Sequence, residues 1–201
     1  MDSIVVGITG ASGSIYGLRL IAELLRADQQ VTVLLTNAGR QVLAFETGVK
    51  ISAEAVEALP QLRDYFGAGE ELSHFALNDF FAPPASGSNA PAAVVICPCS
   101  MGTAGRIAAG LSDNLLERAA DVALKEGKRL LLVPRETPFN QIHLENLLRL
   151  SRAGAQILPA MPAFYQQPET VDDLVNFVVG KVLDNLGIAH QLFERWGENQ
   201  G

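Results

Sequence analysis

The sequence predicts an α/β fold of three layers, in which helices cover both faces of a mostly parallel sheet. Short apolar, β-branched runs alternate with amphipathic helical segments along almost the whole chain. The first run, residues 4–9, has no polar face, which is typical of a strand at the centre of a parallel sheet. The polar or small residues that follow each run mark the turns into the helices.

The elements follow in chain order from these patterns. Strands are expected at 4–9, 31–35, 73–77, 93–97, 129–133 and 156–158. Helices are expected at 14–27, 38–47, 100–109, 113–125, 142–152 and 170–186. Ser100, Asp113 and Thr170 are the expected capping residues. Residues 50–72 read as irregular to helical, and the Pro/Gly/Ser-rich stretch 82–91 reads as a functional loop. This alternation predicts a Rossmann-like (flavodoxin-like) arrangement.

Length and composition fit one domain over residues 1–201. The chain has 48% apolar and 18% charged residues, which is ordinary for a compact protein with one core. Its formal net charge of -7 argues against nucleic-acid binding, which relies on a basic surface. A phosphate site would therefore be built locally, from a few cations and helix N-termini.

Cysteine and histidine usage indicates a reducing compartment and no metal. Cys97 and Cys99 are the two cysteines of the chain, and their C-P-C spacing suits buried thiols better than a disulfide or a zinc cluster. His74, His143 and His190 form no metal-binding or triad pattern. The sequence has no basic leader and no run of 18 apolar residues, so we expect a cytoplasmic protein without a membrane span.

Four polar segments arrive at the carboxyl ends of the expected strands, where ligands bind in such sheets: 10–13, 36–37, 98–103 and 134–136. The first, T-G-A-S-G-S-I-Y-G, matches neither G-x-G-x-x-G nor a P-loop. It still suits one phosphate or the edge of a flavin, the alternative being a tight turn capped by serine. The hydroxyls after the fourth strand likewise fit a ligand or ordinary helix capping.

Charged side chains near these segments allow two interpretations. Arg118 and Lys125 are seven apart on one expected helix and share a face, which suits either an anion or solvent. Arg135 and Glu136 directly follow a buried strand, as a ligand-binding pair or a structural ion pair. Lys181, on the last helix, points to an anion in a cleft or to the surface.

Aromatic residues offer a wall for a ligand. Phe80 and Phe81 precede the Pro-rich loop, and Phe164 and Tyr165 follow a second proline-containing loop. Residues of this kind belong more often to a core than to a ligand wall.

Several long blocks resemble one family. T-G-A-S-G-S-I-Y-G-L-R-L, C-P-C-S-x-G-T, E-R-A-A-D-V-A-L-K-E, L-V-P-R-E-T-P-F, P-A-F-Y-x-x-P and the terminal L-F-E-R-W are similar to blocks of the flavin prenyltransferases of UbiX type, formerly classed as aromatic-acid decarboxylases. The resemblance covers nearly the whole chain. It implies a flavoprotein that joins a dimethylallyl group from dimethylallyl phosphate to N5 and C6 of reduced FMN, without a metal. The product, prenylated FMN, serves a partner decarboxylase of the ubiquinone-pathway type, and the enzyme forms a homo-oligomer, a dodecamer.

Carried over by position, the resemblance implies three groups of site residues. The expected FMN contacts are Gly10, Ala11, Ser12, Thr36, Ser100, Met101, Gly102, Thr103 and Arg135. The expected prenyl-phosphate contacts are Phe80, Arg118, Lys125, Tyr165 and Lys181. The expected catalytic residues are Ser12, Glu46, Lys125 and Glu136. Ser12 would lie near flavin N5, and Glu136 would assist departure of phosphate. Phe80 stands where the family has tryptophan, and Thr36 where it often has serine.

Three other functions remain as alternatives. A flavin-dependent cysteine decarboxylase would need an early catalytic histidine and a P-x-M-N-x-x-M-W motif, both of which the chain lacks. A non-catalytic FMN carrier would need the flavin contacts but not the charged set around Lys125 and Glu136. A direct aromatic-acid decarboxylase would need cofactor chemistry of its own. The sequence leaves open a monophosphate or pyrophosphate donor, and which site residues, such as Tyr165 and Lys181, come from a neighbouring subunit.

Overall fold

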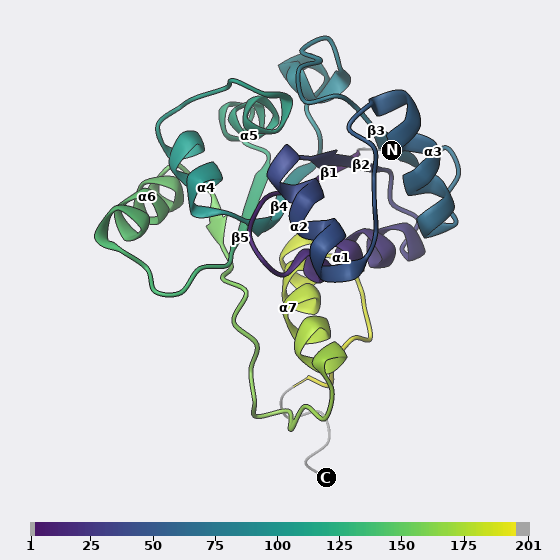
Figure 1. The fold of residues 1–201 in the computed structure, drawn as a ribbon. Helices are drawn as coiled ribbons and strands as arrows, with labels where there is room; N and C mark the ends of the chain where they lie inside the picture. The colour runs from purple at the N-terminus through teal and green to yellow at the C-terminus, as the bar shows by residue number, and fades with distance from the viewer. Residues whose placement is uncertain (1–2, 196–201) are drawn as a thin grey trace.

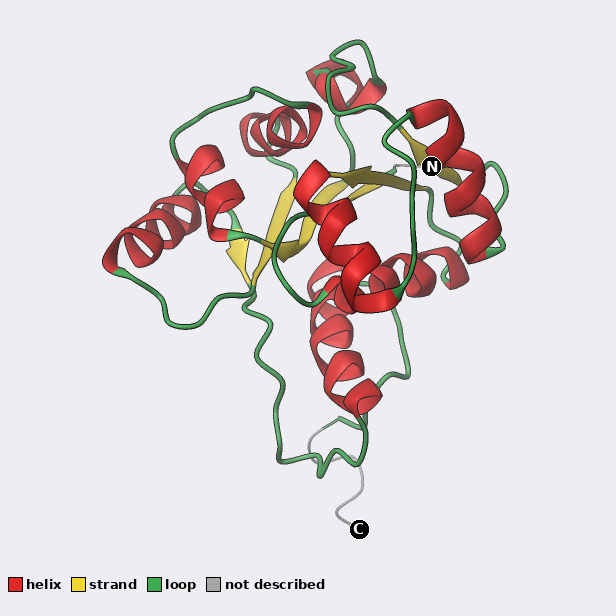
Figure 2. Ribbon diagram, viewed as in Figure 1, coloured by secondary structure: helices red, strands yellow, loops and turns green. Residues whose placement is uncertain are grey.

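The computed structural model describes residues 3–195 and contains a six-stranded sheet with helices on both faces (Figures 1 and 2). The strands are β1 (Ile4–Ile8), β2 (Val31–Leu35), β3 (Leu72–His74), β4 (Ala93–Cys99), β5 (Arg129–Pro134) and β6 (Gln156–Ile157). Neighbouring strands are all parallel, in the order β3-β2-β1-β4-β5-β6. The order reverses between β1 and β4, and the carboxyl ends of these two strands mark the crevice in which such sheets bind ligands.

The helices divide between the two faces of the sheet. They are α1 (Ser14–Arg26), α2 (Asn37–Thr47), α3 (Ala55–Phe66), α4 (Met101–Ala108), α5 (Leu115–Lys125), α6 (Gln141–Arg152) and α7 (Val171–Leu186). Apolar side chains of α1, α3 and α7 form one core with the sheet, and those of α4, α5 and α6 form the other. The predicted three-layer Rossmann-like fold is confirmed. The terminal tryptophan of the L-F-E-R-W block lies outside the described residues.

Both cores draw on the same strands, which explains why the strands have no polar face. In β1, Ile4, Val6 and Ile8 belong to the α1/α7 core, and Val5 belongs to the α4/α5 core. Alternate side chains point to opposite faces of a strand, so burial on both sides requires apolar residues at every position. The sheet therefore holds the loops at its carboxyl edge on a rigid base.

Local boundaries differ from the prediction at several places. Asn114, not Asp113, caps α5, because its Oδ1 accepts the Glu117 amide at 3.0 Å while Asp113 bonds Arg106. A regular helix, α3, forms within 50–72 although Pro60 lies inside it. The third strand starts one residue earlier and ends at His74, and the loop 82–91 contains two short 3-10 turns, Pro83–Ala85 and Gly87–Asn89.

Gly17 lies where α1 crosses the end of β4, and its replacement by alanine is expected to destabilise the fold. A Cβ at this position would overlap the carbonyl oxygen of Cys97 and lie 2.8 Å from Ile8 Cγ1. Backbone cannot yield as a side chain does, so we expect the free energy of unfolding to fall by about 2–3 kcal/mol, measured by urea denaturation. Gly102→Ala on α4 is the control, since nothing lies within 4 Å of its Cβ position. Equal stability of the two variants would contradict the prediction.

No helix among the described residues is long and apolar enough to cross a membrane.

Candidate functional site

A cavity of about 340 Å³ opens at the reversal point of the sheet. It is lined by Gly10, Thr36, Ala38, Ser100, Thr103, Arg106, Asn114, Leu116 and Glu117. The loops after β1, β2 and β4 thus meet, as their place at the carboxyl ends of parallel strands requires. Four of the predicted FMN contacts line this cavity, and its volume is within the range of small-molecule sites.

The N-terminus of α1 is occupied by a carboxylate of the chain itself. The Gly13 amide donates to Glu46 Oε1 at 3.1 Å and Oε2 at 3.0 Å, and the Ser14 amide donates to Oε2 at 2.9 Å. Glu46 comes from the last turn of α2. These amide groups are the ones that would otherwise bind a phosphate at a helix start. Glu46 therefore occupies the amides that a phosphate would need at this turn, and the edge of a flavin stays a prediction here.

Hydrogen bonds hold the pKa of Glu46 below its ordinary value. Burial acts to raise this pKa, but the Ser12 hydroxyl and the Ser14 and Gly13 amides together outweigh it. The Ser14 hydroxyl is buried without a hydrogen-bond partner of its own, and its proximity to Glu46 acts in the same direction. The carboxylate is therefore charged at neutral pH and accepts from Ser12, which was predicted to lie near the flavin.

Glu46→Gln is expected to lower stability at neutral pH and to have little effect in acid. Folding lowers the pKa of Glu46 below its ordinary value of 4.5, so the charged carboxylate stabilises the folded state. This stabilisation is fully present above pH 4.5 and is lost as the pH falls through the lower pKa of the folded state. Since the side chain is largely exposed, we expect a loss of only about 1 kcal/mol at pH 7. Urea denaturation against pH measures it. Glu145→Gln, on the surface of α6, should show no such dependence, and a pH-independent deficit for Glu46→Gln would contradict the prediction.

The start of α4 is open, in contrast to that of α1. Ser100 Oγ accepts the Thr103 amide at 3.3 Å and lies 3.0 Å from Thr103 Oγ1. The Met101 and Gly102 amides belong to the first helical turn and have no partner within the helix. Together with the positive end of the helix dipole, these donors would attract an anion beside the cavity.

Thr9, which the sequence reading did not single out as a site residue, fixes the position of this helix start. Its fully buried hydroxyl donates to the Pro98 carbonyl at 2.8 Å and accepts the Ser100 amide at 2.8 Å. The end of β1 is thereby tied to the end of β4. No local signal marks Thr9, because its partners lie about 90 positions away in the sequence.

Other predicted FMN contacts are buried or are engaged in the fold. Ala11 and Met101 are buried and do not line the cavity. Gly10 packs against α2, where a Cβ would lie 2.6 Å from Ala38 Cβ. Thr36 caps α2 through the Gly39 amide at 2.9 Å and also lines the cavity.

Arg135 joins the end of β5 to the first turn. Its Nε donates to the Ser12 carbonyl at 3.0 Å, and its amide donates to the Cys99 carbonyl at 3.3 Å. Half-buried Glu136 accepts the Thr137 amide at 3.1 Å. Within residues 3–195 Arg135 and Glu136 form no ion pair with each other. The ion pair between Arg135 and Glu136, which was the alternative to a ligand-binding role, is therefore absent. Both charged head groups remain available to a ligand.

Arg118 and Lys125 both contact the Pro-rich loop. Arg118 Nε donates to the Ala85 carbonyl at 3.0 Å, and Nη1 pairs with Asp121 at 2.7 Å. Lys125 Nζ pairs with Glu126 and would lie 2.6 Å from a Cβ at position 87. The two cations thus stand beside loop 82–91, which supports a functional role for the loop.

Tyr165 and Lys181 lie elsewhere. Tyr165 packs edge-on against Phe177, with ring centroids 6.0 Å apart, and Lys181 pairs with Asp184 at 3.4 Å. The segment from β6 to α7 projects from the sheet on the side away from α5 (Figure 1). One chain therefore does not bring Tyr165 and Lys181 to Arg118 and Lys125. Phe80, the fifth predicted prenyl-phosphate contact, is part-exposed just before loop 82–91.

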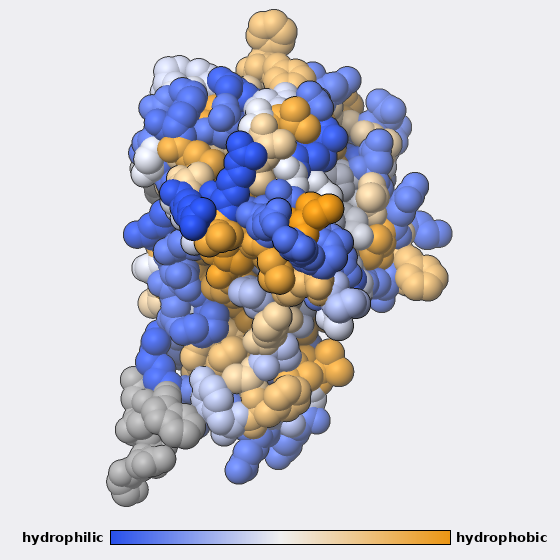
Figure 3. All heavy atoms as spheres, turned by 90° about the vertical axis from the view of Figure 1, so that its left-hand side faces the viewer, coloured by the Kyte–Doolittle hydropathy of each residue, from blue (hydrophilic) through white to orange (hydrophobic). Residues whose placement is uncertain are grey.

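Apolar side chains remain exposed on the α6 side of the molecule. Figure 3 shows apolar patches over this face, continuing onto the projecting segment. Ile142, Leu144 and Leu148 of α6 and Met161 and Phe164 beyond β6 are all more than half exposed. A surface of this kind is typical of an interface between protein chains.

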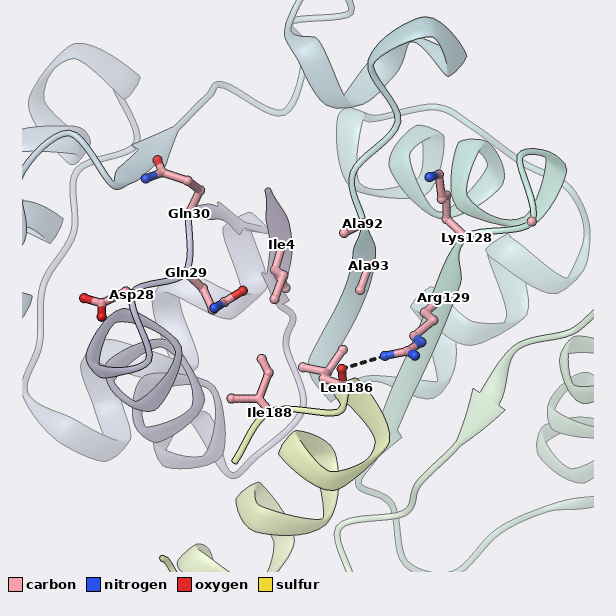
Figure 4. A pocket seen from close by; sticks show the side chains of 11 residues that line it. Ile4, Asp28, Gln29, Gln30, Ala92, Ala93, Lys128, Arg129, Leu186 and Ile188 are labelled. Atoms are coloured by element: carbon pink, nitrogen blue, oxygen red, sulfur yellow. Dashed lines mark hydrogen bonds between the residues drawn. The ribbon is translucent and has the colours of Figure 1, made fainter. Parts of the chain in front are cut away.

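A second cavity, of about 520 Å³, lies at the opposite edge of the sheet (Figure 4). It is lined by residues at the amino ends of the strands, among them Ile4, Ala93 and Arg129, and Arg129 Nη1 is bonded to the Leu186 carbonyl at 2.6 Å. Although it is larger, it contains none of the predicted site residues. Ligands of parallel sheets bind at the carboxyl edge, so we assign the site to the smaller cavity.

The thiols and the acidic groups do not offer a nucleophile or a metal centre here. Cys97 and Cys99 are free and fully buried, and burial raises the pKa of Cys99 to about 12 and that of Cys97 further. Among residues 3–195 no cluster of three or more His, Cys, Asp or Glu side chains has metal-binding geometry.

Comparison with known proteins identifies the family. The flavoprotein family profile matches residues 1–183. A flavin prenyltransferase UbiX of Halalkalibacterium halodurans is 54% identical over 97% of this chain and 93% of its own length. The flavin prenyltransferase UbiX of Pseudomonas aeruginosa is 52% identical over 98% and 95%. This chain belongs to the UbiX flavin prenyltransferase family.

Solved UbiX structures share the whole fold. AnUbiX, determined in complex with FMN and dimethylallyl pyrophosphate, superposes with a TM-score of 0.87 at 36% identity over 98% of this chain and 97% of AnUbiX. A dodecameric FMN-dependent UbiX-like decarboxylase from Escherichia coli superposes with a TM-score of 0.85 at 39% identity, over 99% of this chain and 100% of the relative. A PPC decarboxylase is 16% identical with a TM-score of 0.60, which shows a shared fold alone.

Three polar cavity residues were missing from the predicted UbiX site: Arg106, Asn114 and Glu117. Ser100, Thr103 and Arg106 follow one another at intervals of three, which places them on one face of α4. That spacing is a signal the sequence already contained. Asn114 and Glu117 have no comparable signal, because they reach the cavity through the packing of α5 against α4.

Proposed function

We propose that this chain transfers the dimethylallyl group of dimethylallyl phosphate to N5 and C6 of reduced FMN, releasing phosphate and forming prenylated FMN. One observation carries the proposal. The cavity at the sheet reversal has an open anion-binding helix start at α4, while the start of α1 is closed by Glu46. This arrangement suits a mononucleotide with one phosphate. The relative AnUbiX, solved with FMN and dimethylallyl pyrophosphate, supports the same ligands here.

The residues present fit FMN. Its phosphate would be held by Ser100, Thr103 and the open amides of α4, with Thr36 alongside. Its ring would lie toward the first turn, where Arg135 bonds the Ser12 carbonyl and the Ser12 hydroxyl bonds Glu46. When bound, the reduced flavin supplies the nucleophilic nitrogen and carbon. The charged Glu46 carboxylate orients the Ser12 hydroxyl and serves as an acceptor for a proton passed through it.

The prenyl phosphate would be bound beside loop 82–91. Arg118 and Lys125 supply two positive charges there, which stabilise the negative charge that develops on the departing phosphate. Part-exposed Phe80 offers an aromatic face to the allyl group. Glu136, at the end of β5, assists departure of the phosphate as an acid.

The remaining contacts come from a neighbouring copy. Tyr165 and Lys181 project away from Arg118 and Lys125 within one chain, and the exposed apolar face beside them suits an interface (Figure 3). We therefore propose a homo-oligomer in which one protomer completes the site of the next, as a dodecamer like the Escherichia coli relative.

The wider setting follows from the product and the composition. Prenylated FMN would pass to a prenyl-FMN-dependent decarboxylase of the ubiquinone-pathway type. Buried free thiols and a net charge of -7 support a single flavin-binding domain, residues 1–201, that works in the cytoplasm and does not bind nucleic acid.

Mass spectrometry of the released flavin tests the proposal. The protein is incubated without oxygen with reduced FMN and either dimethylallyl monophosphate or pyrophosphate, and the flavin is then extracted. A flavin heavier by one C5 prenyl unit is expected with at least one donor, and the parallel incubations identify the donor. FMN that is bound but unchanged with both donors would overturn the transferase and favour a flavin carrier.

A further inference from the structure

Arg106 lies on the same face of α4 as the residues that start this helix. It follows Thr103 by three positions and Ser100 by six, and all three line the cavity. Side chains on a helix lean toward its N-terminus. The arginine therefore shares one cavity with the hydroxyls at the start of α4, next to which a phosphate would sit.

Two carboxylates hold the guanidinium on one side. Arg106 Nε donates to Glu117 Oε1 at 2.6 Å, and Nη2 donates to Asp113 Oδ2 at 2.9 Å and to Glu117 Oε2 at 3.4 Å. These contacts raise the pKa of Arg106, so the group is permanently charged. Within the described part of the chain Nη1 has no hydrogen-bond partner, and its two N–H groups are available to a ligand.

Glu117 is itself fixed in place. It is 2% exposed and also accepts the Asp113 amide at 2.9 Å and Asn114 Nδ2 at 2.7 Å. A carboxylate with this many donors has one orientation, which it imposes on Arg106. Glu117 thus links Arg106 of α4 to the residues at the start of α5 through hydrogen bonds.

The cavity otherwise lacks a cation. Arg106 is the one Lys or Arg among the described residues that line it. Serine, threonine and helix amides stabilise a phosphate by hydrogen bonds, and an arginine adds charge-assisted ones. Asp113 and Glu117 together more than balance the charge of Arg106, so the expected effect is that of one or two such hydrogen bonds and not of net charge attraction.

We propose that Arg106 is a further FMN-binding residue, which contacts the flavin phosphate through Nη1 with Glu117 as its positioning residue, and that the cavity thereby selects FMN over riboflavin. This inference rests on the proposed FMN site. It concerns binding and does not require that prenyl transfer occurs.

Flavin fluorescence tests it directly. The Kd of oxidised FMN and that of riboflavin are measured by quenching for the wild-type protein and for Arg106→Met, which keeps the apolar stem of the side chain. FMN should bind about 10- to 100-fold more weakly to the variant, while the Kd for riboflavin changes less than about twofold. Arg106→Lys keeps the positive charge but lacks the planar set of donors of the guanidinium. Its preference for FMN over riboflavin should lie between those of the wild type and Arg106→Met.

Removal of Arg106 leaves Glu117 buried without its main partner, so a second variant is needed. Arg106→Met combined with Glu117→Gln removes both charges, and its fold is checked by circular dichroism. Glu117→Gln alone should weaken FMN binding less than Arg106→Met does, with riboflavin again unchanged. Arg26→Met, on a surface pair at the far end of α1, is the matched control.

Two results would overturn the proposal. An equal loss of affinity for FMN and riboflavin would show that Arg106 supports the cavity wall and does not contact phosphate. Unchanged FMN binding in a folded variant, or a wild-type protein without preference for FMN, would exclude the contact. A wild-type protein that binds FMN but does not prenylate it contradicts the proposed function and leaves the selectivity result standing.

Discussion

Glu136→Gln is expected to lower the rate of prenyl transfer by about 10²- to 10⁴-fold, the usual effect of losing an acid or base. Glutamine keeps the size of the side chain and the hydrogen bond from the Thr137 amide, but it cannot exchange a proton with the departing phosphate. FMN binding should change less than about twofold, because the FMN phosphate is assigned to the start of α4. Single-turnover reactions without oxygen, with the flavin product quantified by mass spectrometry, measure the rate.

Glu145→Gln serves as the matched control for this experiment, since it removes an exposed carboxylate from α6 that bonds only Gln141 among the contacts described. Its rate should equal that of the wild type. If Glu136→Gln retains a rate within about threefold of the wild type, Glu136 does not exchange the proton. The phosphate would then depart with the help of cations alone.

Lys125→Met should reduce prenyl transfer by about 10²- to 10³-fold, the effect of losing one electrostatic stabiliser. Lys125 stands beside loop 82–91 with Glu126 as its ion-pair partner, so its charge is held where the prenyl phosphate is expected. Methionine keeps the apolar stem and removes the ammonium. The loss should appear in kcat as well as in the KM for the donor, because the charge stabilises the departing phosphate more than the bound one.

Lys128→Met removes a similar charge just before β5, from a side chain that acts on Glu126 through its charge but forms no ion pair among the contacts described, and should leave both constants unchanged. An equal loss in the two lysine variants would mean that the overall charge of this surface matters and not the position of Lys125. A change in KM without any change in kcat would assign Lys125 to binding alone.

Much of the fold could be predicted because its signals are local. The apolar strands, the capping Ser100 and Thr170, and the alternation of strand and helix all act over a few residues. The prediction was wrong or imprecise where two local signals compete. Pro60 disfavours a helix that packing nevertheless stabilises, and Asp113 and Asn114 are adjacent caps of similar strength.

The candidate site was predictable only in part, for a different reason. Residues at strand ends converge whenever the strands are parallel, so Ser12, Thr36 and Ser100 follow from topology. Thr9 and Glu117 act through partners brought close by packing, and the angle between α4 and α5 is not encoded in either segment. The contact of Glu46 with the amides of the first turn likewise joins residues that are more than 30 positions apart in the sequence.

The carboxylate of Glu46 has a consequence for the size of nucleotide that the fold accepts. In dinucleotide-binding sheets with this strand order, the pyrophosphate bridge rests on the amides at the start of the first helix. Here the carboxylate of Glu46 binds those amides and so competes with a phosphate for them. A molecule such as NAD or FAD would have to displace it against charge repulsion. The side chain thus favours a mononucleotide in a crevice that accommodates a dinucleotide in other sheets of this strand order.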